Sequence, residues 1–202
     1  MIKNVADNYE SFMTKDVVKL FDKITHTYAW TKETEINRLH FNSWKTNESF
    51  KVNNKFILPM YSGAFYDENW KKYQIEYRVR DTLDDIDKVM NYIANHDNYV
   101  SIVSVIEAGF KEGITQKLES TFFKDIKVHK KGTIHLTFKD ETILRKFNII
   151  AGRERGFLPN EYAKTDYNDL SERDKELVTE FDGNVKTYQN NMLNNQKLLR
   201  IA

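Results

Sequence analysis

The residues of this sequence best suited to chemistry lie in the stretch 122–159, where cations and histidines alternate with apolar positions. Asp125-Ile126-Lys127 matches the Asp-x-Lys pattern with which metal-dependent nucleases hold a divalent ion and orient a water molecule. Such a site needs a further acid beside it, for which Glu107 and Glu119 are the upstream candidates. Because three-residue matches arise often by chance, a nuclease is the least favoured alternative, and we expect the protein not to be an enzyme.

Two histidines in this stretch, His129 and His135, are expected to share one face of a sheet. Asp125 is the only acidic residue near them, and a metal centre needs more ligands. The chain also lacks a glycine-rich phosphate loop, a His-Glu-x-x-His motif and a Gly-x-Ser-x-Gly motif. We therefore expect no metal and no cofactor, and we assign the two histidines a polar role facing nucleic acid.

Positive charge is concentrated in the same part of the chain. Residues 117–155 contain ten cations and five anions, a net charge of +5, whereas residues 161–182 contain three cations and eight anions, a net charge of −5. Cations can anchor phosphates while aromatic faces stack unpaired bases, although an ordinary solvated surface explains such charge runs equally well. The predicted nucleic-acid-binding residues are Lys127, His129, Lys130, Lys131, His135, Lys139, Arg145, Lys146, Arg153, Arg155, Trp44 and Lys45.

A β-hairpin followed by a helix is expected to position these residues. Pairing Val128 with Ile134 and Ile126 with Leu136 places the apolar side chains on one face and leaves residues 130–132 as the loop. Gly132 would then take the positive φ that such loops require. After residue 138 the apolar period changes to that of a helix, for which Asp140 suits the N-cap and Gly152 the C′ position.

The remaining pattern predicts further helices and short strands. Residues 2–28 have helical apolar spacing, with a break allowed near residues 14–16, and residues 49–58 read as a tight hairpin around Asn53-Asn54. Residues 73–79 alternate as a strand, a helix is expected from residues 81–82 to Asn95, and residues 100–110 fit a helix or a buried strand. Ser171 begins a helix that Gly183 interrupts, and the Asn-rich tail that follows could dock on a partner or on a second copy of the chain.

Three acidic residues, Asp84, Asp85 and Asp87, are expected in the first turns of the helix that starts near residue 81. Negative side chains near a helix N-terminus complement the positive end of the helix dipole. We therefore interpret them as capping charge and not as a metal site.

Composition favours a folded α+β protein. Of 202 residues, 40% are hydrophobic and 13% aromatic, the net charge is only +1, and there is no cysteine, which suits a reducing cytoplasm. No apolar run reaches the roughly 18 residues of a membrane span, and no signal peptide is evident. We expect antiparallel hairpins forming a small sheet packed by helices, in a domain of residues 1–165 with a helical extension of residues 166–202, located in the cytoplasm without contact to membranes.

Three blocks of the chain resemble, in order, a bacterial and phage domain-of-unknown-function family, family forty-nine forty-two. They are WKTNESFKVNNKFILP (44–59), DTLDDIDKVMNYI (81–93) and FFKDIKVHKKGTIHLTFKDETILRKFNIIAGRERGFLP (122–159). The resemblance implies a domain often fused to a SAM-dependent adenine DNA methyltransferase and encoded on prophages and conjugative elements. This chain departs from that pattern, because its two prolines, Pro59 and Pro159, stand in no Asn-Pro-Pro or Asp-Pro-Pro methyltransferase motif. The chain is also similar, more weakly, to phage-borne inhibitors of CRISPR or restriction systems.

The sequence alone therefore favours a non-catalytic protein of a phage or mobile element that binds nucleic acid and counteracts host defence. RNA or single strands are favoured over duplex DNA because the net charge is nearly neutral while aromatic residues are plentiful. One alternative is a protein-interaction module that occupies a basic groove of a host defence or RNA-processing complex. Another is an accessory subunit of a DNA methyltransferase. The terminal helix also allows a homodimer.

Overall fold

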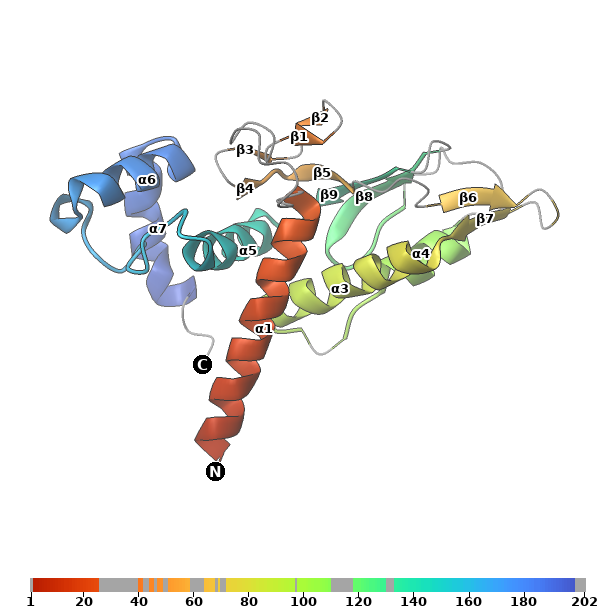
Figure 1. Cartoon of the computed structure of the whole chain (residues 1–202), viewed down its shortest axis with the longest axis horizontal. Helices are drawn as coiled ribbons and strands as arrows, with labels where there is room; N and C mark the ends of the chain where they lie inside the picture. The colour runs from red at the N-terminus through yellow and green to blue at the C-terminus, as the bar shows by residue number, and fades with distance from the viewer. Residues whose placement is uncertain are drawn as a thin grey trace.

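The computed structural model describes residues 2–25, 40–41, 44–45, 47–48, 51–58, 64–67, 69, 72–96, 98–109, 118–129 and 133–198. It is an α+β protein, as predicted, in which helices pack against a small antiparallel sheet (Figure 1). Within the described residues, no helix is both long and apolar enough to cross a membrane.

The three-stranded sheet has β9 (Ile134–Phe138) in the centre, between β5 (Lys55–Leu58) and β8 (Phe123–Val128). The predicted register of the hairpin is confirmed, because Ile126 pairs with Leu136 and Val128 with Ile134. The backbone N–H of His129 donates to the carbonyl of Thr133 at 2.9 Å, which closes the ladder before the predicted loop. Residues 130–132 lie outside the described residues, so the positive φ of Gly132 stays a prediction.

Three helices cover the inner face of this sheet: α1 (Ile2–Thr25), α3 (Tyr77–Ala94) and α5 (Glu141–Glu154). Their apolar stripes meet the inward side chains of the strands in one core, with Phe21, Phe56 and Phe147 almost fully buried. Each such side chain contributes about 1.5–3 kcal/mol by leaving water. Helix α1 is unbroken, so the break allowed near residues 14–16 is absent.

The predicted hairpin around Asn53-Asn54 is wrong. β4 (Lys51–Val52) pairs with β3 (Asn47–Glu48), whereas β5 pairs with β9 across the sheet. The Asn148 side chain on α5 accepts from the Val52 N–H at 2.8 Å and donates to the Val52 carbonyl at 3.0 Å. The side-chain amide of Asn148 thus supplies the hydrogen bonds to the Val52 backbone that a neighbouring strand would supply in a hairpin.

The predicted strand 73–79 is correct only in its first half. β7 (Lys72–Ile75) pairs with β6 (Ala64–Asp67), and α3 begins at Tyr77, about one turn earlier than predicted. Glu76 is the N-cap, because its carboxylate accepts from the Arg78 N–H at 3.1 Å. Apolar residues alternate on both sides of Glu76, and this alternation is also the pattern of a strand. The helix ends at Asn95, as predicted, in the left-handed conformation.

The three acidic residues of α3 therefore do not cap that helix. Asp84 and Asp85 are exposed further along it, and Asp87 is fully buried. The carboxylate of Asp87 accepts from the backbone N–H of Ile102 at 2.7 Å, at the start of the next helix, α4 (Ile102–Gly109). The stretch 100–110 thus contains a helix over Ile102–Gly109, whose first backbone N–H is capped by a side chain of α3.

The end of α5 also differs from the prediction. Asp140 is the N-cap, as expected, but the helix continues through Gly152, which is buried against Leu158. Gly156 adopts the positive φ of 68° just beyond the C-cap residue Arg155. The position that requires glycine's conformational freedom is therefore 156. Gly152 instead permits close packing, because a Cβ there would lie 3.0 Å from a methyl carbon of Leu158.

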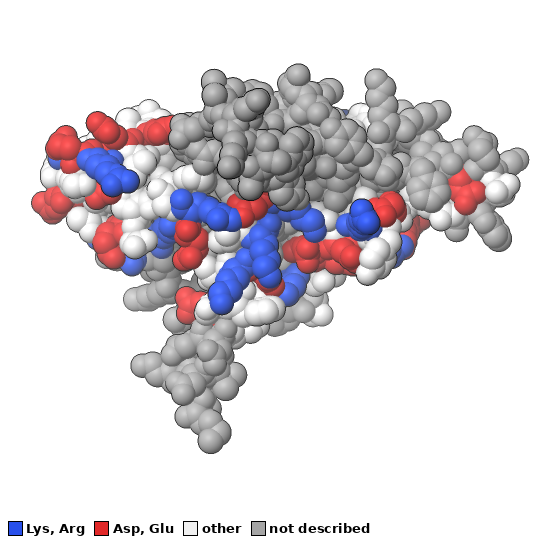
Figure 2. All heavy atoms as spheres, in the orientation of Figure 1, with Lys and Arg blue, Asp and Glu red and all other residues white. Residues whose placement is uncertain are grey.

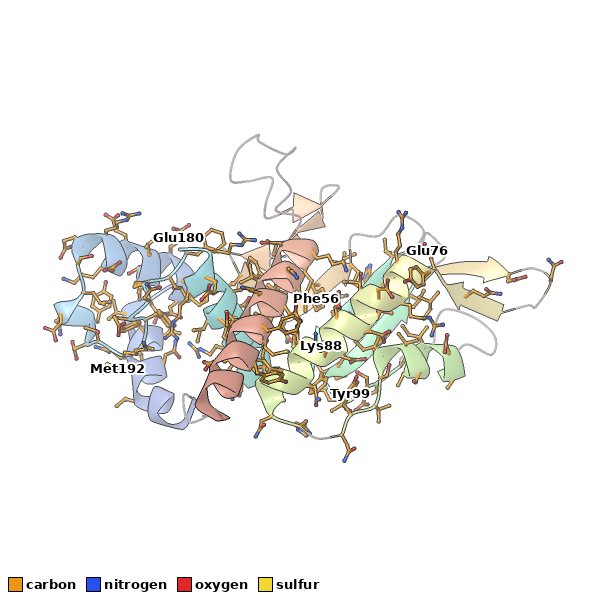
Figure 3. The ribbon with its side chains drawn as sticks, turned by 60° about the horizontal axis from the view of Figure 1, so that its bottom comes forward. Phe56, Glu76, Lys88, Tyr99, Glu180 and Met192 are labelled. Carbon is orange, nitrogen blue, oxygen red and sulfur yellow. The ribbon has the colours of Figure 1, made fainter. Side chains whose placement is uncertain are left out.

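Beyond α5 the chain forms a second, smaller hydrophobic cluster around Tyr162, Phe181 and Tyr188. It contains a 3-10 turn (Tyr167–Asp169), α6 (Glu172–Asp182) and α7 (Val185–Leu198), with Ser171 as N-cap of α6 and Gly183 ending it, both as predicted. This cluster begins at Leu158, inside the range predicted for the first domain. Figure 3 shows Glu180 and Met192 on these helices, far from Phe56 in the main core.

A buried polar network joins the second cluster to α5. The Tyr162 hydroxyl donates to Asp182 at 2.8 Å, and Asn191 donates to the Tyr162 hydroxyl at 2.7 Å. Arg145 on α5 lies 3.5 Å from the same Asp182 carboxylate. The backbone of Tyr162 also accepts from Arg153 at 2.5 Å, so α5 contacts both hydrophobic clusters.

The remaining short strands, β1 (His40–Phe41) and β2 (Trp44–Lys45), pair with each other.

Candidate nucleic-acid interface

The outer face of the three-stranded sheet carries the polar half of the predicted hairpin. Ile57, His135 and Lys127 stand in one cross-strand row, and Lys55, Thr137 and Asp125 stand in the next. Side chains alternate along a strand, so these point away from the core that their neighbours form. We call Lys55, Lys127, His129 and His135 the sheet-face cluster.

The two lysines and two histidines of the sheet-face cluster lie close together on a partly buried surface. The rings of His129 and His135 lie 4.2 Å apart, centroid to centroid. Burial, followed by the proximity of His129, Lys55 and Lys127, lowers the pKa of His135 to about 4. Asp125 opposes this effect, and its carboxylate lies 3.4 Å from Lys127. The histidine is therefore neutral at pH 7, in an environment that would favour an incoming anion.

The other predicted binding residues near this sheet either form an ion pair within the protein or lie outside the described residues. Lys139, just after β9, forms an ion pair with Glu119 at 2.5 Å. Lys130 and Lys131 lie outside the described residues, as do the side chains of Trp44 and Lys45, whose backbone forms β2.

The structure does not bring the α5 cations to the sheet-face cluster. The first three, Arg145, Lys146 and Arg153, lie on α5, and Arg155 is its C-cap residue. This helix covers the inner face of the sheet, whereas the cluster occupies the outer face. Arg145 contacts Asp182, Arg153 contacts the Tyr162 carbonyl, and Arg155 pairs with Asp22 of α1. Burial lowers the pKa of Arg153. The predicted basic surface is thus split between two faces, and three of its arginines make contacts inside the protein.

The residues of the nuclease alternative are also dispersed. Glu107 pairs with Arg80, and Glu119 pairs with Lys139, while Asp125 contacts Lys127. In the part of the chain that the structure describes, no group of three or more His, Cys, Asp or Glu side chains could hold a metal ion. No observation here supports the Asp-x-Lys pattern as a metal site.

A second charged surface, not predicted from the sequence, lies between α1 and α3. A groove of about 510 Å³ is lined there by Phe12, Asp16, Lys19, Leu20, Asp22, Lys23, Asp85, Lys88 and Val89. Lys and Arg side chains gather over α1 in the middle of the face shown in Figure 2, and Lys88 lies beside α1 in Figure 3. The four-residue spacing of Lys15, Lys19 and Lys23 was the signal in the sequence that could have revealed this surface.

Most of the aromatic side chains whose burial the structure describes belong to the core. Phe122, Phe123 and Phe138 are buried, so the aromatic residues beside the predicted cations stack on one another and not on a ligand. Large aromatic side chains with substantial exposure include Tyr9, Phe12, Tyr77 and Tyr99. Of these, Phe12 lies in the α1–α3 groove.

Fold and surface together define an α+β domain with a cation-rich sheet face, followed by a small helical cluster. The chain belongs to the family described as Domain of unknown function (DUF4942), whose model matches residues 1–157. The match ends one residue before the second hydrophobic cluster begins. Comparison with curated proteins and with solved structures found no match.

Proposed function

We propose that this protein is a non-catalytic nucleic-acid-binding protein that contacts phosphates through the sheet-face cluster. The observation that carries the proposal is the convergence of Lys55, Lys127, His129 and His135 on one side of β5, β9 and β8, with Asp125 as the acid beside them. Phosphate contacts from lysine and hydrogen-bonding side chains supply most of the affinity of such proteins.

Electrostatics supports this proposal. Like charges placed together on a half-buried surface raise the free energy of the charged forms, and a bound polyanion removes that cost. Binding should therefore raise the pKa of His135 from about 4 towards its usual range, and affinity should rise as pH falls below 7.

RNA or a single strand is the favoured ligand, and the proposed cellular role is action on a host defence or RNA-processing complex. The chain's net charge of +1 argues against a protein that coats duplex DNA through charge alone. The anti-defence role rests on the resemblance to phage-borne inhibitors. The absence of cysteine suits the cytoplasm as the place of action.

Fluorescence anisotropy of a labelled single-stranded RNA tests the proposal. The double variant Lys55→Gln/Lys127→Gln should weaken binding by at least about tenfold, because two phosphate contacts are removed. A matched control, Lys164→Gln/Lys186→Gln, removes the same charge from exposed positions beyond residue 157 and should leave affinity unchanged. Equal affinity of the two double variants would refute the sheet-face cluster as the site.

The extension favours a second candidate, a protein-interaction module. Glu172, Glu176 and Glu180 are exposed along one face of α6, because residues four apart share a helix face. This acidic ridge would suit a basic groove on a partner. Figure 2 shows Asp and Glu side chains at the left, over these helices, with Lys and Arg between them. Capture of a host protein that survives nuclease treatment but is lost in Glu172→Gln/Glu176→Gln/Glu180→Gln would favour this candidate over the first.

A further inference from the structure

We propose that the groove between α1 and α3 binds single-stranded nucleic acid, with lysines holding the phosphates and Phe12 stacking on a base. This inference rests on the proposed function and adds to it a second surface and a preference for unpaired strands. The groove lies on the solvent side of the helices that cover the inner sheet face, so it is separate from the sheet-face cluster.

The first support is a row of lysines along α1. Lys15, Lys19 and Lys23 recur every four residues, so they lie on one helix face about 6 Å apart along the axis. Lys15 is exposed, and the side chain of Lys19 is 78% exposed. Lys88 approaches the same groove from α3. Such a line of cations can follow a phosphate backbone.

The second support is the aromatic lip of the groove. The Phe12 side chain is 54% exposed, and the ammonium of Lys88 lies 5.0 Å from its ring centroid. One turn earlier on α1, Tyr9 is 57% exposed and stands edge-on to Tyr92 of α3 at 5.9 Å. An aromatic ring that stays in water beside cations is a ready stacking surface, because every base presents a π-face.

Carboxylates in the groove do not cancel this potential. Asp16 contacts Lys88 at 2.6 Å, Asp85 contacts Lys23 at 3.3 Å, and Asp22 pairs with Arg155. Each acid therefore has a cation of its own. Lys19 has only a long contact of 3.8 Å with Asp16, and within the described residues Lys15 forms no ion pair. Lys19 is therefore the lining cation that these ion pairs leave over, and Lys15 adds an exposed positive charge beside the groove.

The row of lysines and the exposed Phe12 ring together point to a single strand as the ligand. A duplex offers phosphates to the lysines, but its bases are already stacked and cannot reach Phe12. The groove offers the exposed ring of Phe12 next to the lining lysines Lys19 and Lys23. A single strand satisfies both groups at once.

The test compares a labelled 12-nucleotide single-stranded RNA with the blunt duplex of the same sequence, using the full chain. Phe12→Ala should weaken single-strand binding by about fivefold to 150-fold, equivalent to about 1–3 kcal/mol per stacked base, and leave duplex binding unchanged. Tyr77→Ala, which removes another exposed ring at the opposite end of α3, is the matched control and should not change either affinity. Circular dichroism and thermal unfolding of both variants verify that the fold is kept.

The outcomes separate this inference from the proposed function. If the unsubstituted protein binds neither RNA, the proposed function fails and the inference fails with it. If it binds RNA and loses affinity in Lys55→Gln/Lys127→Gln but not in Phe12→Ala, the proposed function stands and the groove is refuted. An equal loss of single-strand and duplex affinity in Lys15→Gln/Lys19→Gln, without an effect of Phe12→Ala, would also overturn the preference for single strands.

Discussion

Asp87 lies fully buried between the middle of α3 and the first turn of α4. Burial raises the pKa of Asp87 to about 7, against the opposing hydrogen bonds from Ile102 and Ser101, and the nearby Asp84 adds to the rise. Its second oxygen, Oδ1, is buried without a hydrogen-bond partner among the described residues. The protonated carboxyl is thus the favoured form of Asp87 in the folded protein, and ionising it lowers the free energy of unfolding.

The sign of the resulting pH dependence follows from linkage. Between about pH 4 and pH 7 the folded state holds a proton on Asp87 that the unfolded chain has released, so stability falls as pH rises through this window. Asp87→Asn still accepts from Ile102 but cannot ionise. The advantage of the variant over the parent protein should therefore grow by about 2–3 kcal/mol between pH 5 and pH 8.

Urea unfolding at both pH values measures this difference, and comparing the two proteins cancels the other titrating groups. The exposed Asp81→Asn, also on α3, serves as the control and should show no such growth. An advantage of Asp87→Asn that is the same at pH 5 and pH 8 would contradict a raised pKa for Asp87.

Asn148 connects α5 to β4 through a buried side-chain amide. Its amide satisfies both backbone groups of Val52, and it is buried itself. Asn148→Ala leaves a buried N–H and a buried carbonyl without partners, which should cost about 2–4 kcal/mol. Chemical denaturation against Asn190→Ala, an exposed asparagine of α7, measures this cost. A loss no greater than that of the control would show that Asn148 is dispensable.

Local pattern was enough to predict the β8–β9 hairpin and the N-caps of α5 and α6, because each is encoded within a few consecutive residues. The pairing of Val52 with Asn148 spans 96 positions, so a local reading replaced it with a hairpin around Asn53-Asn54. The start of α3 was misplaced for a related reason: alternation of Tyr73, Ile75, Tyr77 and Val79 favours a strand until the Glu76 cap is known.

The candidate site was predictable only in part. Alternation placed Lys127, His129 and His135 on one sheet face correctly, but the sequence could not show that Lys55 joins them from a strand 72 positions before Lys127. Nor could it show that Arg145, Arg153 and Arg155 make contacts within the protein. The α1–α3 groove depends on two helices that are distant in sequence, and only the lysine spacing within α1 was visible beforehand.

At the scale of the whole molecule, the end of the family match at residue 157 separates the cation-rich surfaces from the acidic face of α6. The part that matches the DUF4942 model carries the sheet-face cluster and the α1–α3 groove, and the following helices carry the acidic ridge of α6. The network of Tyr162, Asp182 and Asn191, with Arg145 from α5, ties the two parts together. Burial raises the pKa of both Tyr162 and Asp182. The proposed nucleic-acid surface and the acidic segment therefore belong to two parts that α5 joins through buried contacts.

The salt dependence of RNA binding tests the central claim most directly. The affinity of the full chain for a single-stranded RNA is measured by anisotropy from low to physiological salt, and its logarithm is plotted against the logarithm of salt concentration. Three to five phosphate contacts predict a linear fall with a slope of about −2 to −3.5, because each contact releases about 0.7 of a counterion from a single strand. A slope near zero, or no binding at low salt, would contradict a nucleic-acid interface on this protein.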